Sequence, residues 1–257
     1  WSDGVKQLTA YDVEKFSPSA GVLFKETDQL SLYANYMEGL SQGKIAPSGT
    51  ANQNDIFPPF VSRQAEAGAK YDMGKFALTA AVFRIKQPAY DTADDGNFGP
   101  NGKRVNDGVE LNVFGEPIDG VRLLGGVMYI DSELKDTNNG GANDGNRAPA
   151  TPKLNANFGA EWDLPGIHGL TLTGRGIYSS SQYLDQANNQ EIGSWTRYDL
   201  GARYAFKVNE TDVTLRGTVE NVANSRDWIS AGASDDSAAG LTLSTPRTFV
   251  LSATLGF

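Results

Sequence analysis

Hydrophobic and polar side chains alternate along most of this chain, in segments of about ten residues separated by turn-forming residues. In the final segment, 247–257, Phe249 and Leu251 fall on one face of a strand, whereas Thr248 and Ser252 fall on the other. Successive side chains of a strand point to opposite faces, so this pattern predicts β-structure. It predicts about eleven strands, at 16–25, 29–38, 62–71, 76–86, 105–114, 121–131, 154–164, 170–180, 196–208, 212–221 and 247–257.

Charged side chains stand in the middle of several predicted strands, on the face opposite the apolar residues. A bare charge in a dry core is costly, whereas a charge that faces a water-filled lumen costs little. The pattern therefore predicts an all-β transmembrane antiparallel β-barrel, apolar outside and polar inside. The expected lipid-facing residues include Phe158, Ala160, Leu200, Ala202, Tyr204, Leu251 and Leu255. The expected lumen-facing charges are Glu66, Glu110, Glu161, Arg203, Arg216 and Glu220.

The connections between the predicted strands alternate in length. Short connections occur at 26–28, 72–75, 115–120, 165–169 and 208–211. Long polar connections occur at 41–59, 87–104, 132–152, 182–194 and 222–245. In outer-membrane barrels, short turns face the periplasm and long loops face outward. Aromatic residues at the short-turn ends are expected to form the periplasmic girdle, namely Phe24, Tyr71, Phe114, Trp162, Phe206 and Phe257.

The alternation of loop lengths also assigns a direction to each strand. The last strand runs from a long loop toward the periplasm, and counting back, the strand at 16–25 runs the same way. Residues 1–13 are therefore expected on the outer side. A complete single-chain bacterial barrel has an even number of strands and two periplasmic termini. We therefore expect residues 1–257 to form the C-terminal part of a larger barrel whose first strands lie outside this sequence.

Composition narrows the remaining classes of function. The chain has 257 residues, no Cys and a formal net charge of −9, which argues against disulfides, thiolate metal sites and nucleic-acid binding. Its mean hydropathy of −0.39 would be ordinary for a soluble protein, but barrel strands expose only alternate residues to lipid. No run of 18 apolar residues is present, so the sequence predicts no transmembrane helix.

Several short motifs resemble one known family in their order and spacing. They include Leu30-Ser-Leu-Tyr-Ala-Asn-Tyr-Met-Glu-Gly39, Gln64-Ala-Glu-Ala-Gly-Ala-Lys-Tyr71 and Arg147-Ala-Pro-Ala-Thr-Pro152. Val219-Glu-Asn-Val222 and Thr245-Pro-Arg-Thr-Phe249 follow near the end. The chain resembles the TonB-dependent siderophore receptors over nearly its whole length.

This resemblance implies a 22-stranded barrel closed by an N-terminal plug domain, of which the present chain would form the C-terminal half. It implies a location in the bacterial outer membrane, a ferric siderophore as ligand and coupling to the TonB complex through the plug. The plug and the first strands would be absent from residues 1–257. Outer-membrane lipid and lipopolysaccharide would surround the barrel.

Catalysis and metal binding have little support in the sequence. His168, the only histidine, lies in a short turn where solvation is the simplest interpretation, and no triad can be built from it. Acidic loop residues could suggest a hard-cation site, but solvation of the loops is the preferred interpretation of these residues: Asp91, Asp94, Asp95, Asp235 and Asp236. We therefore predict no enzyme, no metal site and no cofactor.

Aromatic residues within or near the long loops are the best candidates for ligand binding. A ferric siderophore is a bulky, partly apolar chelate that aromatic faces and hydrogen bonds can hold without contact to iron. The same residues would also suit an outer aromatic girdle, and both interpretations stay open. The candidates are Phe57, Tyr90, Phe98, Tyr183, Trp195 and Trp228.

Two other classes of protein compete with a receptor. A passive outer-membrane channel would share the barrel but need no plug, and would need a constriction loop inside the pore. A soluble β-sandwich would also show alternation, but charged residues on one face and aromatic residues at strand ends argue against it.

Overall fold

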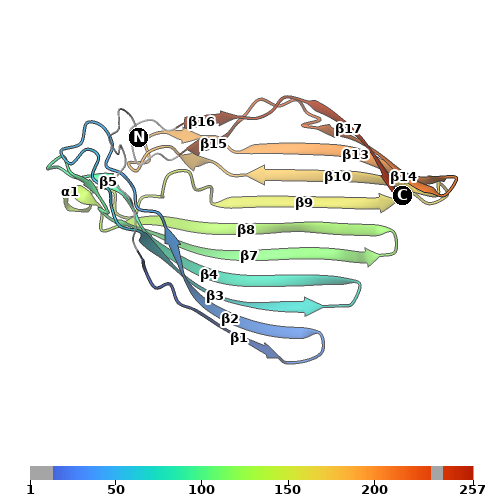
Figure 1. Cartoon of the computed structure of the whole chain (residues 1–257), viewed down its shortest axis with the longest axis horizontal. Helices are drawn as coiled ribbons and strands as arrows, with labels where there is room; N and C mark the ends of the chain where they lie inside the picture. Colours follow the sequence, from blue (N-terminus) through green and yellow to red (C-terminus); the bar gives the residue numbers. More distant parts are fainter. Residues whose placement is uncertain (1–13, 233–239, 257) are drawn as a thin grey trace, which may run out of the picture.

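The computed structural model describes residues 14–232 and 240–256, and eleven of its strands form one antiparallel sheet. Each strand pairs with the next one along the sheet (Figure 1). The eleven strands predicted from alternation are therefore confirmed. In sheet order they are β1 (Ser19–Lys25), β2 (Leu30–Ser41), β3 (Phe60–Asp72), β4 (Phe76–Pro88), β7 (Lys103–Ile118), β8 (Val121–Lys135), β9 (Leu154–Asp163), β10 (Leu170–Ser179), β13 (Trp195–Val208), β14 (Thr211–Glu220) and β17 (Thr248–Gly256).

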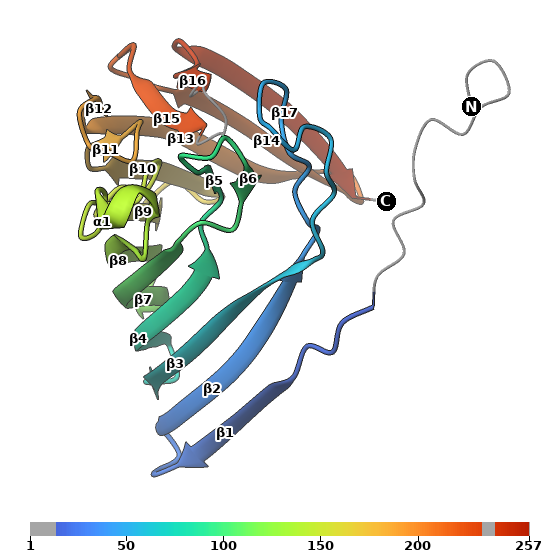
Figure 2. The same ribbon diagram turned by 90° about the vertical axis from the view of Figure 1, so that its left-hand side faces the viewer.

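The sheet is curved and does not close on itself (Figure 2). Strands β1 and β17 form its two edges, and each has one neighbour in the described part of the chain. The side chains of β1 are exposed along its whole length. No helix among the described residues is long and apolar enough to cross a membrane.

The two faces of the sheet differ in chemistry as predicted. Residues paired across neighbouring strands share a face, and the register places Leu200, Val219 and Phe249 in one apolar row. Leu200 is 55% exposed and Leu251 is 85% exposed, as expected for side chains that face lipid. All six predicted lumen charges lie on the opposite, concave face, where Arg203 bonds to Glu161.

One of the predicted girdle residues lies on the wrong face. Phe114 pairs with Leu124, which in turn pairs with Gly159, and this row shares the face of Glu161. Phe114 therefore faces the lumen, because it lies two residues from Asn112 and four from Glu110 on β7 and so shares their face. The other described girdle residues lie on the apolar face, and Phe257 lies outside the described residues: Phe24, Tyr71, Trp162 and Phe206.

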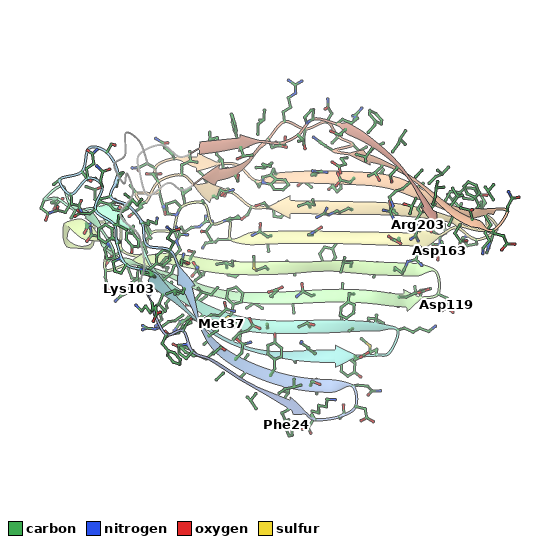
Figure 3. The ribbon with its side chains drawn as sticks, viewed as in Figure 1. Phe24, Met37, Lys103, Asp119, Asp163 and Arg203 are labelled. Atoms are coloured by element: carbon green, nitrogen blue, oxygen red, sulfur yellow. The ribbon has the colours of Figure 1, made fainter. Side chains whose placement is uncertain are left out.

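The long connections contain local structure that alternation did not reveal, because the pieces are too short to show a period. All project from one end of the sheet, and the short turns lie at the other end (Figure 1). Figure 3 places Lys103 toward the loop end and Arg203 toward the turn end. The additional elements are β5 (Asp91–Thr92), β6 (Phe98–Gly99), α1 (Asn138–Gly141), β11 (Gln182–Tyr183), β12 (Glu191–Ile192), β15 (Trp228–Gly232) and β16 (Gly240–Leu243).

Candidate ligand-binding site in the long loops

The first two long loops are joined by one asparagine. Asn52 accepts a hydrogen bond from the backbone N–H of Phe98 at 2.8 Å and donates its amide to the carbonyl of Phe98 at 2.9 Å. The backbone N–H of Ala51 donates to the carbonyl of Gly96 at 2.7 Å. Loop 41–59 is thereby fixed against the β5–β6 hairpin.

An aromatic cluster fills the space between these two loops. The ring of Tyr90 lies 5.7 Å from those of Phe57, Phe60 and Phe98, measured between centroids. Tyr90 and Phe98 are each only 3% exposed. The structure thus brings together three of the predicted ligand-binding residues, but as the small hydrophobic core of a loop module. Rings that cover one another offer little free face for a ligand to stack on.

Cationic side chains accompany this cluster, and sequence reasoning missed them. The ammonium of Lys44 lies 5.2 Å from the centroid of the Tyr90 ring. Burial, and then the nearby charge of Arg104, lower the pKa of Lys44 from its ordinary value. Arg104 donates to the carbonyl of Pro149 at 3.5 Å. Single Lys and Arg residues in aperiodic loops carry no pattern from which this grouping could be predicted.

A second module joins the third and fourth long loops around Arg147. Asn188 accepts from the backbone N–H of Arg147 and donates to its carbonyl, both at 2.9 Å. The guanidinium of Arg147 lies 5.2 Å from the Tyr183 ring and donates to the carbonyl of Ser181 at 3.3 Å. One face of the candidate Tyr183 is therefore occupied by a cation. Arg147 opens one of the motifs quoted above, which is the only sequence signal for it.

The two tryptophan candidates meet at β15, of which Trp228 is the first residue. The indole N–H of Trp195 donates to the carbonyl of Ile229 at 3.1 Å. Trp228 is 47% exposed, the most exposed of the six candidates. The six residues therefore form two groups at the loop end, and Trp228 presents the largest free aromatic surface.

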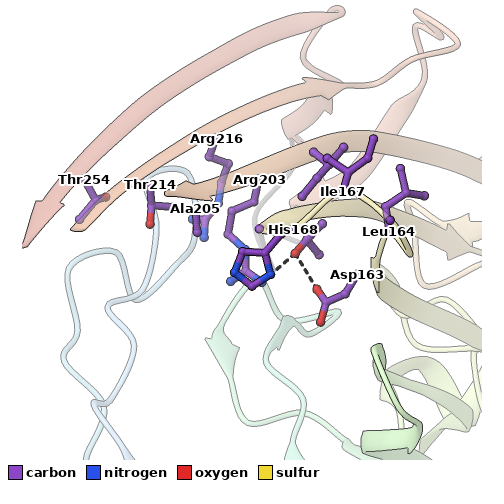
Figure 4. A pocket seen from close by; sticks show the side chains of 13 residues that line it. Asp163, Leu164, Ile167, His168, Arg203, Ala205, Thr214, Arg216 and Thr254 are labelled. Carbon is purple, nitrogen blue, oxygen red and sulfur yellow. Dashed lines mark hydrogen bonds between the residues drawn. The ribbon is translucent and has the colours of Figure 1, made fainter. Parts of the chain in front are cut away.

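A cavity of about 850 Å³ lies at the opposite end of the sheet, beside the turn that holds His168 (Figure 4). Arg203 donates to Glu161 at 3.4 Å and to the hydroxyl of Thr171 at 3.3 Å. The hydroxyl of Thr171 donates to Asp163 at 2.7 Å. His168 is an exposed turn residue at the rim, as expected from the sequence.

A metal site finds no support in the described residues. Within 14–232 and 240–256, no three His, Cys, Asp or Glu side chains lie close enough to hold an ion. Asp95 instead accepts from the backbone and amide of Asn97, and Asp91 accepts from the backbone of Thr92. Asp235 and Asp236 lie outside the described residues.

An open antiparallel sheet with an apolar outer face, a polar inner face and structured loops at one end defines part of the wall of an outer-membrane barrel. The chain belongs to the family described as TonB dependent receptor-like, beta-barrel, whose model matches residues 1–222. Family membership confirms the resemblance drawn from the motifs and the outer-membrane location.

The chain is similar to several receptors. It is 37% identical over 252 residues to the ferrichrome receptor FcuA of Yersinia enterocolitica, which covers 96% of this chain and 33% of the relative. The crystal structure of BauA, the ferric preacinetobactin receptor of Acinetobacter baumannii, superimposes with a TM-score of 0.79 at 39% identity, covering 93% of this chain and 36% of BauA. The siderophore receptor PiuA of A. baumannii gives 0.74 at 27% identity, covering 92% and 35%. The chain thus spans about a third of the length of these relatives.

Proposed function

We propose that this chain supplies the C-terminal half of the barrel of an outer-membrane receptor that takes up a ferric siderophore in a TonB-dependent manner. The observation that carries the proposal is the pair of aromatic and cationic loop modules at the outer end of a polar lumen wall, in a member of this receptor family. The named relatives, a ferrichrome receptor and a ferric preacinetobactin receptor, support a siderophore as the ligand class.

The two sheet edges support the proposal that further strands complete the barrel. Strands β1 and β17 each have one neighbour in the described residues. A backbone edge left unpaired in hydrocarbon costs several kcal/mol for each unsatisfied group, so only a closed barrel is stable there. In the whole receptor, strands that precede residue 1 would pair with both edges, and an N-terminal plug would occupy the lumen and contact TonB. Outer-membrane lipid and lipopolysaccharide would cover the apolar face.

In this arrangement the loops hold the siderophore and no residue acts as a catalyst. Trp228 offers a free aromatic face, and the cations Lys44, Arg104 and Arg147 supply charge and hydrogen-bond donors near the aromatic residues. Tyr90 and Phe98, which are buried, would contribute by holding the first two loops in shape. The short turns at the other end would not contact the siderophore.

A binding experiment on the purified full-length receptor tests this function. Ferric hydroxamate, ferric catecholate and mixed-donor chelates are titrated while tryptophan fluorescence is followed. We expect saturable binding of at least one class, weakened by Trp228→Ala and unchanged by Ile167→Ala at the exposed turn end. Failure of all three classes to bind, together with an open conductance in planar bilayers, would instead indicate a passive channel.

A further inference from the structure

Two arginines from different segments meet at one turn of the third long loop. Arg104 is the second residue of β7 and lies on the lumen face of that strand. Its guanidinium donates to the carbonyl of Pro149 at 3.5 Å. The guanidinium of Arg147 donates to the carbonyl of Thr151, on the same turn, at 3.4 Å. Lys103, the neighbour of Arg104, lies toward the loop end of the sheet (Figure 3), so the two arginines stand at the outer mouth of the lumen.

Neither arginine forms an ion pair with a carboxylate in residues 14–232 or 240–256. Their guanidinium groups bond there only to backbone carbonyls, and that of Arg147 also lies over the ring of Tyr183. These bonds are 3.3–3.5 Å long, which is at or beyond the weak end of the usual range. A guanidinium has more N–H donors than these bonds use. Arg104 and Arg147 are both partly exposed, so the remaining donors are accessible to a ligand.

The carboxylates of the surrounding segments are engaged by other groups. Lys103 forms an ion pair with Asp136 at 2.6 Å, and Lys135 forms one with Glu133 at 2.9 Å. Asp185 accepts hydrogen bonds from backbone N–H groups of its own turn. A partly buried charge without a partner is costly. The two arginines therefore favour a bound anion.

The arginines are connected to the free aromatic surface of the loops. Arg147 donates to the carbonyl of Ser181 at 3.3 Å, and the next residue, Gln182, donates to the carbonyl of Ile229 at 3.5 Å. Ile229 follows Trp228, the most exposed aromatic candidate. Arginine presents a planar fork of donors that suits delocalised anionic oxygens, and it stacks on flat rings. One ligand can therefore contact Trp228 and place negative oxygens against the arginines.

We refer to Arg104 and Arg147 as the outer arginine pair, and we propose that this pair makes the receptor select ferric chelates with a net negative charge over neutral ones. A ferric ion held by three doubly charged catecholates is an anion, whereas three singly charged hydroxamates neutralise it. The negative oxygens of the chelate lie against the outer arginine pair and receive charge-assisted hydrogen bonds. This inference rests on the proposed function and adds the charge class of the ligand.

Titration of the purified full-length receptor with two matched chelates tests this selection. The probes are the ferric complexes of a tris-catecholate and a tris-hydroxamate built on the same backbone, so that they differ in charge but little in size. We expect the anionic chelate to bind roughly tenfold more tightly or better. Raising the salt concentration should weaken the binding of the anionic chelate and leave that of the neutral one unchanged, because salt screens charges. Affinities for the two chelates that respond equally to salt would contradict the proposal.

Charge variants assign the selection to the arginines. Arg104→Gln should weaken binding of the anionic chelate roughly tenfold and leave that of the neutral chelate within about twofold of wild type, whereas Arg104→Lys should keep most of the preference. Lys25→Gln is the matched control, because it removes the same charge at the exposed end of β1, beside a short turn, and it should change neither affinity. Equal weakening of both chelates by Arg104→Gln, or an equal effect of Lys25→Gln, would overturn the proposal.

The outcomes separate this selection from the proposed function. A receptor that binds the neutral chelate as tightly as the anionic one, or that binds only a mixed-donor chelate, refutes the selection alone. A receptor that binds none of these three chelates refutes the proposed function.

Discussion

Asn221 holds the last long loop together, and its replacement by alanine is expected to release that loop. The residue follows β14 with a φ of 52° and is 1% exposed. Its side-chain oxygen accepts from the backbone N–H of Ser225 at 3.0 Å, and its amide donates to the carbonyls of Ser225 and Thr245, each at 2.9 Å. The bond to Thr245 connects the beginning of the loop to its end.

The size of the effect follows from these contacts. Alanine at position 221 loses these three hydrogen bonds, each with a net value of about 1 kcal/mol. It also loses a longer bond of 3.3 Å from the hydroxyl of Ser225, which adds little because that hydroxyl can turn to another acceptor. A left-handed backbone costs alanine about 1 kcal/mol more than asparagine, which tolerates that region. The bond from the backbone N–H of Asn221 to Asp199, at 2.8 Å, survives the substitution. The total of about 4 kcal/mol corresponds to local opening that is about a thousandfold more frequent.

Hydrogen exchange of the full-length receptor in detergent measures this opening. Backbone amides at 222–232 and 240–247 should exchange about a thousandfold faster in Asn221→Ala, or at the unprotected limit, while those of β9 and β10 stay unchanged. Asn221→Gly is the matched control, because it loses the same side-chain bonds but has no strain at positive φ, so its effect should be about fivefold smaller. Exchange in Asn221→Ala within twofold of wild type would refute the reasoning.

Three further predictions concern the membrane face, the ligand and pH. Leu251→Arg on the lipid face should lower the free energy of unfolding of the vesicle-embedded receptor in urea by about 2–4 kcal/mol, whereas Ser252→Arg on the lumen face should lower it far less. Equal decreases in the two variants would mean that the faces are misassigned. Trp228→Ala should weaken siderophore binding by about 1–3 kcal/mol in titrations, and an unchanged affinity would remove it from the site. Hydrogen bonds from the backbone and hydroxyl of Thr137 hold the pKa of Asp144 below its ordinary value of 3.8. This stabilisation is complete above that value and is lost as the pH falls below it. Hydrogen exchange of the backbone amides at 136–146, corrected for its intrinsic pH dependence, should therefore accelerate below about pH 4 in wild type. The same amides should show no such acceleration in Asp144→Asn.

The strands could be predicted because lipid and water impose opposite demands on alternate residues. On β13, Leu200 and Tyr204 are exposed on the apolar face, while Arg203 between them is bonded on the polar face. Phe114 shows the limit of such reasoning. Its aromatic ring at a strand end suggested the girdle, but positions 110, 112 and 114 fall on one face of the strand. Phe114 therefore shares the lumen face of Glu110 and Asn112.

The candidate site could be predicted only in part, because loop contacts have no period. Asn52 reaches the backbone of Phe98 across 46 residues of sequence. The burial of Tyr90 follows from that contact and from the packing of three other rings around it. Residue type alone therefore identified the aromatic residues, but it could not separate Tyr90, which is part of a loop core, from Trp228, which is exposed.

We propose that this chain belongs to the wall of a receptor that takes up a ferric siderophore by using TonB. The most direct test measures the uptake of radiolabelled iron, supplied as the chelate that binds best. The host is a Gram-negative bacterium in which the full-length receptor is the only siderophore receptor. We expect uptake that saturates with chelate concentration and falls to background when TonB is deleted. Uptake that rises linearly with concentration and is unaffected by loss of TonB would contradict this function and indicate a passive channel.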